Sequence, residues 1–368
     1  MSCGFFVPYL NKPFNLLLRF LLAFTATILL YSPLLSQDSH PLFNTEEPIH
    51  FTITVDKSVL LADRGKDPQY HSGSVIVNDS AGNAHTLAAK FRARGHFRKD
   101  EKICRFAPLL INFEKGKEKK GSPFAGQNKL KMVMPCESDE YTEREYLLYK
   151  VYNLLTPLSL KVRRVKLTLT DSADHTNTEL ISGFLLEPTD QVAIRNNMVE
   201  VEKQGLSPEY LLPSDFALMA VFQFFAGNTD WSVQFQQNIE LAGPTKNAAL
   251  SPIPYDFDHA GFVNAPYAQP AEELDMQSVR ERRYRGYCLS SLESLQPVFA
   301  IFREKRKEIE DLYRLNTNLP DSYKKWSLDY INAFYLLIDQ PKRVKEAFNY
   351  PCRPGGTGGV IIKGMKEQ

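Results

Sequence analysis

Hydrophobic and polar residues alternate in several short segments of the first half of the chain. In HFTITV, residues 50–55, every second residue is apolar, which is typical of a strand with one buried face. Similar patterns predict strands at residues 73–79, 85–95, 107–116, 128–134, 161–171 and 179–188. A polar turn, DSAGNA, lies between the second and third of these segments. We expect five or six strands from this part of the chain.

One segment between these strands has a helical period instead. Leu147 and Val151 recur at helical spacing, and Pro157 ends the pattern. Thr142 and Glu145, three residues apart, can form a capping box at the start of this helix. The sequence therefore predicts one helix, from about Thr142, within the strand-rich half.

The second half of the chain is mainly helical in pattern. Residues 213–227 predict an apolar helix, and residues 290–350 predict two or three amphipathic helices. Residues 238–243 and 250–258 predict a short hairpin between them. A strand-rich half followed by a helix-rich half indicates an α+β fold with two lobes.

The composition adds few constraints on function. Of the 368 residues, 43% are hydrophobic and 24% are charged, and the formal net charge is +1. Such a chain can bury a sizeable core. Because the charge is nearly balanced, we expect no nucleic-acid partner.

The N-terminus has the pattern of a secretory signal peptide. Lys12 and Arg19 precede an apolar run, and small residues follow it. We therefore expect residues 1–36 to be a signal peptide that meets the membrane only transiently, and the mature protein to be secreted or to lie in the periplasm or cell envelope. The alternative is a membrane anchor formed by residues 16–35.

The remaining segments follow from these patterns. The expected domains are a linker at 37–50, a strand-rich lobe at 51–190, a helical lobe at 191–352 and a flexible Gly-rich tail at 353–368.

The cysteines fit an exported protein. Outside the signal peptide the chain has Cys104, Cys136, Cys288 and Cys352, an even number that allows three disulfide pairings. We predict the pairing of neighbours, Cys104 with Cys136 and Cys288 with Cys352; the alternative is four free thiols. The scattered His residues and the lack of a C-x-x-C motif give no indication of a zinc site.

Acidic residues gather around the predicted hairpin. Asp256 and Asp258 lie two residues apart in PYDFDHAG. If Asn238 faces Asp256, the hairpin turn centres on residue 247, among turn-forming residues, and Asp230 lies shortly before Asn238. Carboxylate and amide oxygens of this kind suit Mg²⁺ or Mn²⁺. The alternative interpretation is an ordinary polar turn.

The order of these residues is that of phosphoryl-transfer enzymes. Protein kinases use an Asp, then an Asn, then a second Asp, together with a strand Lys that binds phosphate and a helix Glu that orients it. Lys129 and Lys131 share one face of a predicted strand, and Glu145 lies on the helix that follows. We therefore expect a two-lobed protein-kinase-like fold. The alternative is that these charges only face solvent.

Five segments from about Lys90 to Gly261 resemble the spore-coat protein H (CotH-like) kinase family, whose members are secreted or coat-associated atypical kinases. They are FRARGHFRK, TEREYLLYKVYNLL, LISGFLLEP, GNTDWSVQFQQNIEL and PIPYDFDHAG. The first is similar to the family's R-x-R-G-x-S/T segment, and the last to its P-W-D-x-D motif. His96 and Tyr255 depart from the residues usual in these motifs, and the chain has no G-x-G-x-x-G loop.

The resemblance implies roles for several residues. Asp230 would be the catalytic Asp, Asn238 and Asp256 would bind the metal with help from Asp258, and Glu187 would lie near the adenine. By the general order of kinase residues, Lys129 and Lys131 on the strand and Glu145 on the helix would contact the nucleotide. Arg94 alternates with Arg92 onto one face of a predicted strand and would meet phosphates; the alternative is a solvated strand face.

The expected activity is that of an atypical protein kinase. It would transfer the γ-phosphoryl group of ATP, with Mg²⁺ or Mn²⁺, to a Ser or Thr hydroxyl of a secreted or envelope protein. One alternative is a catalytically inactive binding or structural protein of the cell envelope. Another is a phosphotransferase that acts on a small molecule.

Overall fold

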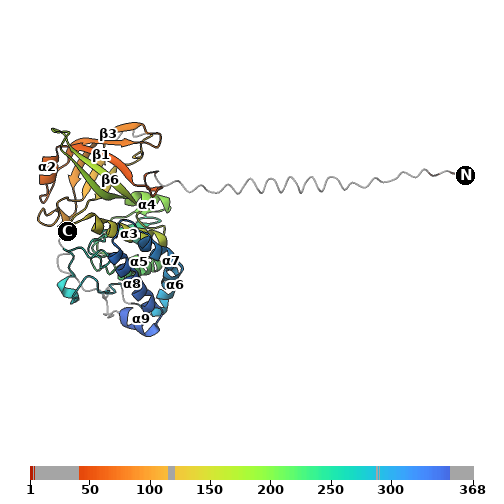
Figure 1. Ribbon diagram of the computed structural model, residues 1–368. Coiled ribbons are helices and arrows are strands. Elements are labelled where there is room, and N and C mark those ends of the chain that lie inside the picture. Colours follow the sequence, from red (N-terminus) through yellow and green to blue (C-terminus); the bar gives the residue numbers. More distant parts are fainter. Residues whose placement is uncertain (3, 5–40, 115–120, 287–288, 290, 349–368) are drawn as a thin grey trace. The chain divides into compact units, whose positions relative to one another are not determined.

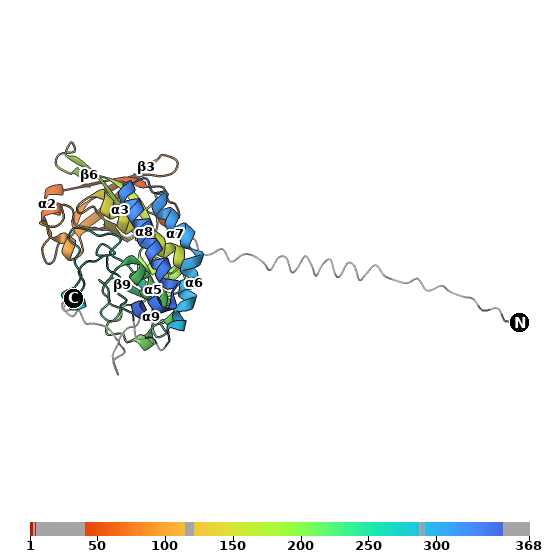
Figure 2. The same cartoon turned by 60° about the horizontal axis from the view of Figure 1, so that its bottom comes forward.

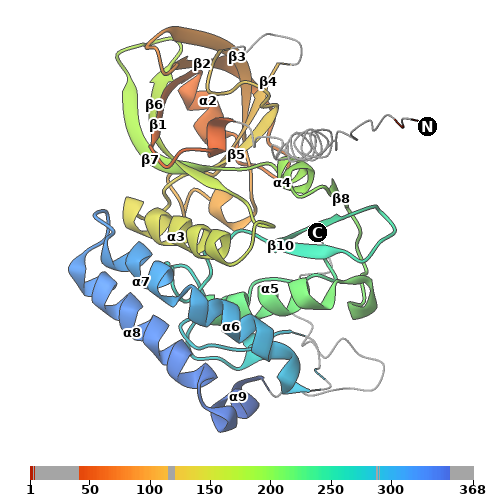
Figure 3. The ribbon, with the colours of Figure 1, turned by 90° about the vertical axis from the view of Figure 1, so that its right-hand side faces the viewer.

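The first half of the chain forms a closed β-barrel (Figures 1 and 3). The computed structural model describes residues 41–114, 121–286 and 291–348, together with residues 1, 2, 4 and 289. The barrel strands are β1 (Ile49–Val55), β2 (His71–Asn78), β3 (Ala84–Ala93), β4 (Leu109–Phe113), β5 (Lys129–Val133), β6 (Val162–Asp171) and β7 (Thr178–Leu186). Their order around the barrel is β1-β2-β3-β4-β5-β7-β6, and β6 closes it by pairing with β1 in parallel.

The alternating pattern of the strands accounts for the barrel core. In β1, Phe51, Ile53 and Val55 are buried, while the residues between them are more exposed. Phe124, from the segment before β5, packs against Phe51 with ring centroids 5.4 Å apart, and against Phe113 at 5.1 Å. Apolar side chains therefore fill the inside of the barrel.

The expectation of a two-lobed protein-kinase-like fold is wrong. The barrel has seven strands, not the expected five or six, and each of the segments with an alternating pattern contains one of them, but they close into a barrel and do not form the strand-rich lobe of that fold. Closure depends on the parallel pairing of β1 with β6, such as Phe51 with Leu167, between residues far apart in the sequence. Alternation predicts that a segment is a strand, but it does not specify the partner of that strand.

The helices lie mainly in the second half of the chain. They are α2 (Lys57–Ala62), α3 (Asp139–Leu155), α4 (Thr189–Arg195), α5 (Pro213–Ala226), α6 (Gln296–Glu304), α7 (Arg306–Arg314), α8 (Asp321–Ile338) and α9 (Pro341–Phe348). Helix α3 lies between the barrel and helices α5 to α8, and α7 packs beside α8 (Figures 2 and 3). Because α3 begins at Asp139, Thr142 lies inside the helix and the predicted capping box is wrong.

A small three-stranded sheet accompanies the helices. It contains β8 (Val199–Glu200), β9 (Ile239–Gly243) and β10 (Ser251–Pro254), and β9 and β10 form the predicted hairpin. Its register differs by one residue from the prediction, since Pro254 pairs with Ile239 and the Tyr255 N–H donates to the Asn238 carbonyl oxygen. Asn238 and Asp256 still lie at the same end of the hairpin.

Several predictions concern the ends of the chain. The tail at 353–368, the pairing of Cys288 with Cys352 and, apart from residues 1, 2 and 4, the signal peptide at 1–36 lie outside the described residues. The predicted disulfide between Cys104 and Cys136 is confirmed. Within the described part of the chain, every helix is too short or too polar to cross a membrane.

Candidate functional site

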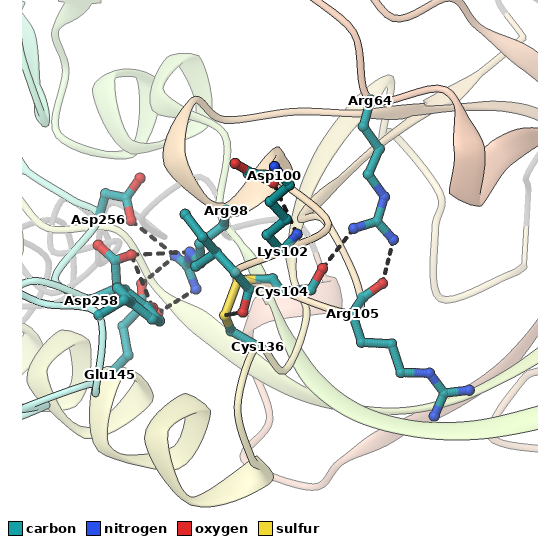
Figure 4. The surroundings of a disulfide bond; sticks show 12 residues. Arg64, Arg98, Asp100, Lys102, Cys104, Arg105, Cys136, Glu145, Asp256 and Asp258 are labelled. Carbon is teal, nitrogen blue, oxygen red and sulfur yellow. Dashed lines mark hydrogen bonds and ion pairs between the residues drawn. A yellow bond between two sulfur atoms is a disulfide. The ribbon is translucent and has the colours of Figure 1, made fainter.

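Arg98 lies at the centre of a group of acidic side chains (Figure 4). It belongs to a short 3₁₀ helix, η2 (Phe97–Lys99), in the segment between β3 and β4, and its side chain is only 7% exposed. Its guanidinium forms ion pairs with Glu145 of α3 at 3.1 Å, Asp256 at 3.0 Å and Asp258 at 3.1 Å. We call these four residues the Arg98 cluster.

The Arg98 cluster contains more acid than base. Burial raises the pKa of Glu145 to about 8, and the charges of Asp256 and Asp258 add to this shift although Arg98 opposes it. Burial also raises the pKa of Asp258. Burial would raise the pKa of Asp256 as well, but the charges of Arg98 and Arg94 outweigh it and lower that pKa. The cluster therefore combines one cation with three carboxyl groups that do not all ionise readily.

Asp230 and Asn238 are in direct contact, as their predicted convergence requires. The Asn238 side-chain amide donates to the Asp230 carboxylate at 3.0 Å and to the Asp230 carbonyl oxygen at 2.8 Å. The Gln237 amide donates to the other carboxylate oxygen at 2.6 Å. Burial raises the pKa of Asp230, while the charge of His259 opposes this shift and that of Asp256 adds to it. Asp230 thus lies within electrostatic reach of the Arg98 cluster.

The backbone at the end of the hairpin has an uncommon conformation. Asn238 has a φ of 52° and Asp256 a φ of 58°, both in the left-handed region. Few non-glycine residues adopt this region, although Asn and Asp tolerate it best, and such conformations occur often at functional sites. Asn238 directly precedes β9 and Asp256 comes shortly after β10, so the side-chain alternation of the two strands does not extend to these residues.

Of the two strand lysines, Lys131 lies closer to these residues. Its Nζ is 2.9 Å from Glu240 Oε1 and 4.6 Å from the centre of the Tyr255 ring, next to Asp256. Lys129 is exposed. Glu145, expected to orient one of these lysines, forms its ion pair with Arg98 instead.

Arg94 and Glu187 have different surroundings. Arg94 lies just after β3, and its charge contributes to the lowered pKa of Asp256. Glu187 is buried and accepts hydrogen bonds from the Arg195 side chain at 2.9 and 3.0 Å and from the Lys161 N–H at 2.9 Å. Its carboxylate is therefore engaged within the protein, which does not fit the expected contact with adenine.

Three further residues of the site, Arg98, His259 and Tyr267, have no role that a sequence pattern predicted. The Tyr267 hydroxyl donates to Asp258 at 3.2 Å, and the His259 ring lies 5.7 Å from the Tyr267 ring and 5.4 Å from that of Phe97. Strand alternation through FRARG could not identify Arg98, because the strand ends at Ala93. Its position in the segment FRARGHFRK was the one signal available in the sequence.

Some of these residues have the donors that a metal-bound nucleotide needs. In the described part of the chain, no group of three or more His, Cys, Asp and Glu side chains could hold a metal alone. Mg²⁺, however, usually binds one or two carboxylates and completes its shell with water and phosphate oxygens. The Asp256 side chain is 27% exposed, and Asn238 uses its amide nitrogen to bind Asp230, which leaves its amide oxygen to serve as a metal ligand. Asn238 and Asp256 thus fit Mg²⁺ or Mn²⁺ held together with phosphates.

Comparison of the chain with models of known protein families and with curated proteins found no match. The resemblance to the spore-coat protein H family therefore rests on the five quoted segments alone. Any assignment of function has to come from the geometry of Asp230, Asn238 and the Arg98 cluster.

Proposed function

We propose that this protein is a metal-dependent phosphotransferase. It transfers the γ-phosphoryl group of ATP to a Ser or Thr hydroxyl of a secreted or envelope protein. The observation that carries the proposal is the excess of carboxyl groups around Arg98, next to the hydrogen-bonded pair of Asp230 and Asn238. Phosphoryl transfer needs acids of this kind to hold a divalent cation and to orient a hydroxyl.

In this proposal Asp230 orients the attacking hydroxyl and accepts its proton. Hydrogen bonds from Gln237 and Asn238 fix both oxygens of its carboxylate, and burial raises its pKa. A carboxylate held in one orientation suits this role, because general bases act on a proton within hydrogen-bond reach.

The phosphates would be held from two directions. Asn238 and Asp256 would hold Mg²⁺ or Mn²⁺, which would neutralise the charge on the phosphoryl group being transferred. Lys131 and Arg94, at the end of the barrel nearest Asp256, are the candidate cations for the phosphate oxygens. Arg98 would act differently, since its ion pairs fix Glu145, Asp256 and Asp258 relative to one another.

One observation favours the alternative of an inactive binding or structural protein of the envelope. Arg98 already neutralises charge on Asp256 and Asp258, two of the expected metal ligands. A buried Arg can serve in this way as a permanent internal cation, and the cluster would then only stabilise the fold. The two functions differ in whether ATP with a divalent ion binds at all.

A transfer assay with labelled ATP and Mn²⁺ tests the proposal. We expect Asp230→Asn to lower the transfer rate on the order of 10²–10⁴-fold, the usual effect of losing a positioned acid–base group. It should keep the rise in melting temperature caused by Mn²⁺ and ATP, because other residues bind the nucleotide. Asp329→Asn, at an exposed position on α8, is the matched control and should leave transfer unchanged.

The acceptor panel should include generic proteins and small hydroxyl compounds. Transfer only to small molecules would support a small-molecule phosphotransferase. Absence of both transfer and nucleotide-dependent stabilisation with every divalent ion tried would reject the enzyme and leave the structural alternative.

A further inference from the structure

The segment that carries Arg98 is a long connection between two adjacent barrel strands. Strands β3 and β4 pair directly, and the Arg94 N–H donates to the Pro108 carbonyl oxygen at 2.8 Å where the segment leaves and rejoins the barrel. Between these residues, η2 is the one regular element. The barrel thus fixes the two ends of the segment but not its middle, where Arg98 lies.

The disulfide attaches the middle of this segment to the start of α3 (Figure 4). Cys104 is fully buried, and Cys136 lies shortly before Asp139, the first residue of the helix. The same helix carries Glu145, the partner of Arg98. Two connections, one covalent and one ionic, therefore join the Arg98 segment to α3.

A tight, hydrogen-bonded turn connects the disulfide to the residues around Arg98. The Asp100 carbonyl oxygen accepts from the Ile103 and Cys104 N–H groups, each at 3.0 Å, and the Asp100 N–H donates to the Phe97 carbonyl oxygen at 3.2 Å. These bonds leave little freedom between residues 97 and 104. The disulfide, this turn, the Arg98–Glu145 ion pair and the first turns of α3 form a closed ring.

We propose that the Cys104–Cys136 disulfide is a positioning device that holds Arg98 in the Arg98 cluster, so that the site is complete only in the oxidised chain. A buried ion pair is favourable only when its geometry is good, and holding a long side chain in place has an entropic cost. The ring favours good ion-pair geometry and lowers the entropic cost of holding the Arg98 side chain, because it confines Arg98 near Glu145 before the ion pair forms. The link to catalysis rests on the proposed function, whereas the positioning of Arg98 does not.

Reduction by a dithiol would undo this arrangement. Cys136 is partly exposed whereas Cys104 is buried, so the reductant thiolate would attack the Cys136 sulfur and release Cys104 as a thiolate. The second thiol of the reductant would then resolve the mixed disulfide, which leaves two protein thiols and an oxidised, cyclic reductant. A site of this kind would be completed after the chain enters an oxidising compartment.

Hydrogen exchange of a Cys104→Ser/Cys136→Ser variant tests the positioning without any nucleotide. We expect the amides of residues 97–104 to exchange at least about tenfold faster than in the wild type, with α8 unchanged as an internal reference. Cys288→Ser/Cys352→Ser is the matched control and should leave residues 97–104 unchanged. If the first variant does not fold, mild reduction of the folded wild type by a dithiol supplies the same comparison. Unchanged exchange at residues 97–104 would overturn the proposal.

A double-mutant cycle on nucleotide affinity separates positioning from general stabilisation. Loss of the disulfide should weaken binding of Mn²⁺ and ATP by about tenfold to a hundredfold, a typical cost of a misplaced group. In an Arg98→Met background the same loss should have little further effect. Equal effects in both backgrounds would overturn the proposal. Altered exchange in a protein that binds no nucleotide would reject the proposed function and keep the positioning role.

Discussion

Glu143 and Glu145 lie two residues apart on α3, yet their surroundings differ in kind. Glu143 accepts hydrogen bonds from Arg164 at 3.0 and 2.6 Å and from the Asn316 side chain at 2.6 Å. One carboxylate therefore meets one guanidinium and one amide, with no excess charge. Glu187 and Arg195 form a similar balanced pair.

The surroundings of Glu145 contain more carboxyl groups than cations. It shares the single guanidinium of Arg98 with Asp256 and Asp258, and its pKa is raised to about 8, first by burial. Balanced pairs satisfy their charges within the protein and account for structure. An unbalanced, buried cluster keeps capacity for a further cation, which makes it the better candidate for a functional site. The difference between the two sides of α3 can be tested by paired substitutions.

Replacing the two arginines should give the largest contrast. Arg98→Met leaves three carboxyl groups without their cation, and we expect the free energy of unfolding to fall by about 3 kcal/mol. Mn²⁺ should recover part of this loss, because it can neutralise the remaining carboxylates. Denaturant unfolding with and without Mn²⁺ measures both effects.

Arg164→Met is the control on the balanced side. It should destabilise the protein less, because Arg164 is more exposed and Asn316 still binds Glu143. Mn²⁺ should restore nothing in this variant. Equal recovery by Mn²⁺ in both variants would contradict the distinction between the two sides.

The two glutamates should differ in their effect on the pH dependence of stability. The pKa of Glu145 is raised from its ordinary value of 4.5 to about 8, so within this range the folded chain holds a proton that the unfolded chain releases. The contribution of Glu145 to stability therefore declines as the pH rises from about 4.5 to about 8. Glu145→Gln cannot titrate, and its stability relative to the wild type should increase over the same range.

Glu143→Gln is the matched control for the pH experiment. Its stability relative to the wild type should not increase as the pH rises, because Glu143 faces a single guanidinium and lies outside the Arg98 cluster. Urea unfolding at several pH values between 4.5 and 8 compares the three proteins. The same upward trend for both variants would mean that the cluster does not retain a proton at Glu145.

The smallest expected effect concerns the two strand lysines. Lys131→Met should weaken binding of Mn²⁺ and ATP by about fivefold, or ~1 kcal/mol, as expected for a partly exposed charge. Lys129→Met, on the same face of β5 but exposed, should leave the affinity unchanged. Titration followed by intrinsic fluorescence or calorimetry measures both. A larger loss of affinity in Lys129→Met than in Lys131→Met would indicate that the phosphate site lies away from Tyr255 and the Arg98 cluster.

Local patterns in the sequence were sufficient for the elements. Period-two alternation located every strand of the barrel, because each has one face toward a packed core, and helical spacing located α3 and α5. Turn residues identified the β9–β10 hairpin, and proximity in sequence was enough to pair Cys104 with Cys136. The contact between Asp230 and Asn238 followed because both lie at one end of that hairpin.

The arrangement of these elements depended on contacts between distant residues. Parallel pairing of β1 with β6 closes the barrel, and a one-residue change of register places Tyr255, not Asp256, opposite Asn238. Arg98 meets Glu145 and Asp256 only because the segment after β3 leaves the barrel and is tied to α3 by a disulfide. Alternation and spacing report how a residue relates to its neighbours in the chain. Strand partners, register and ion pairs depend on which surfaces meet after folding, and local patterns carry no information about them.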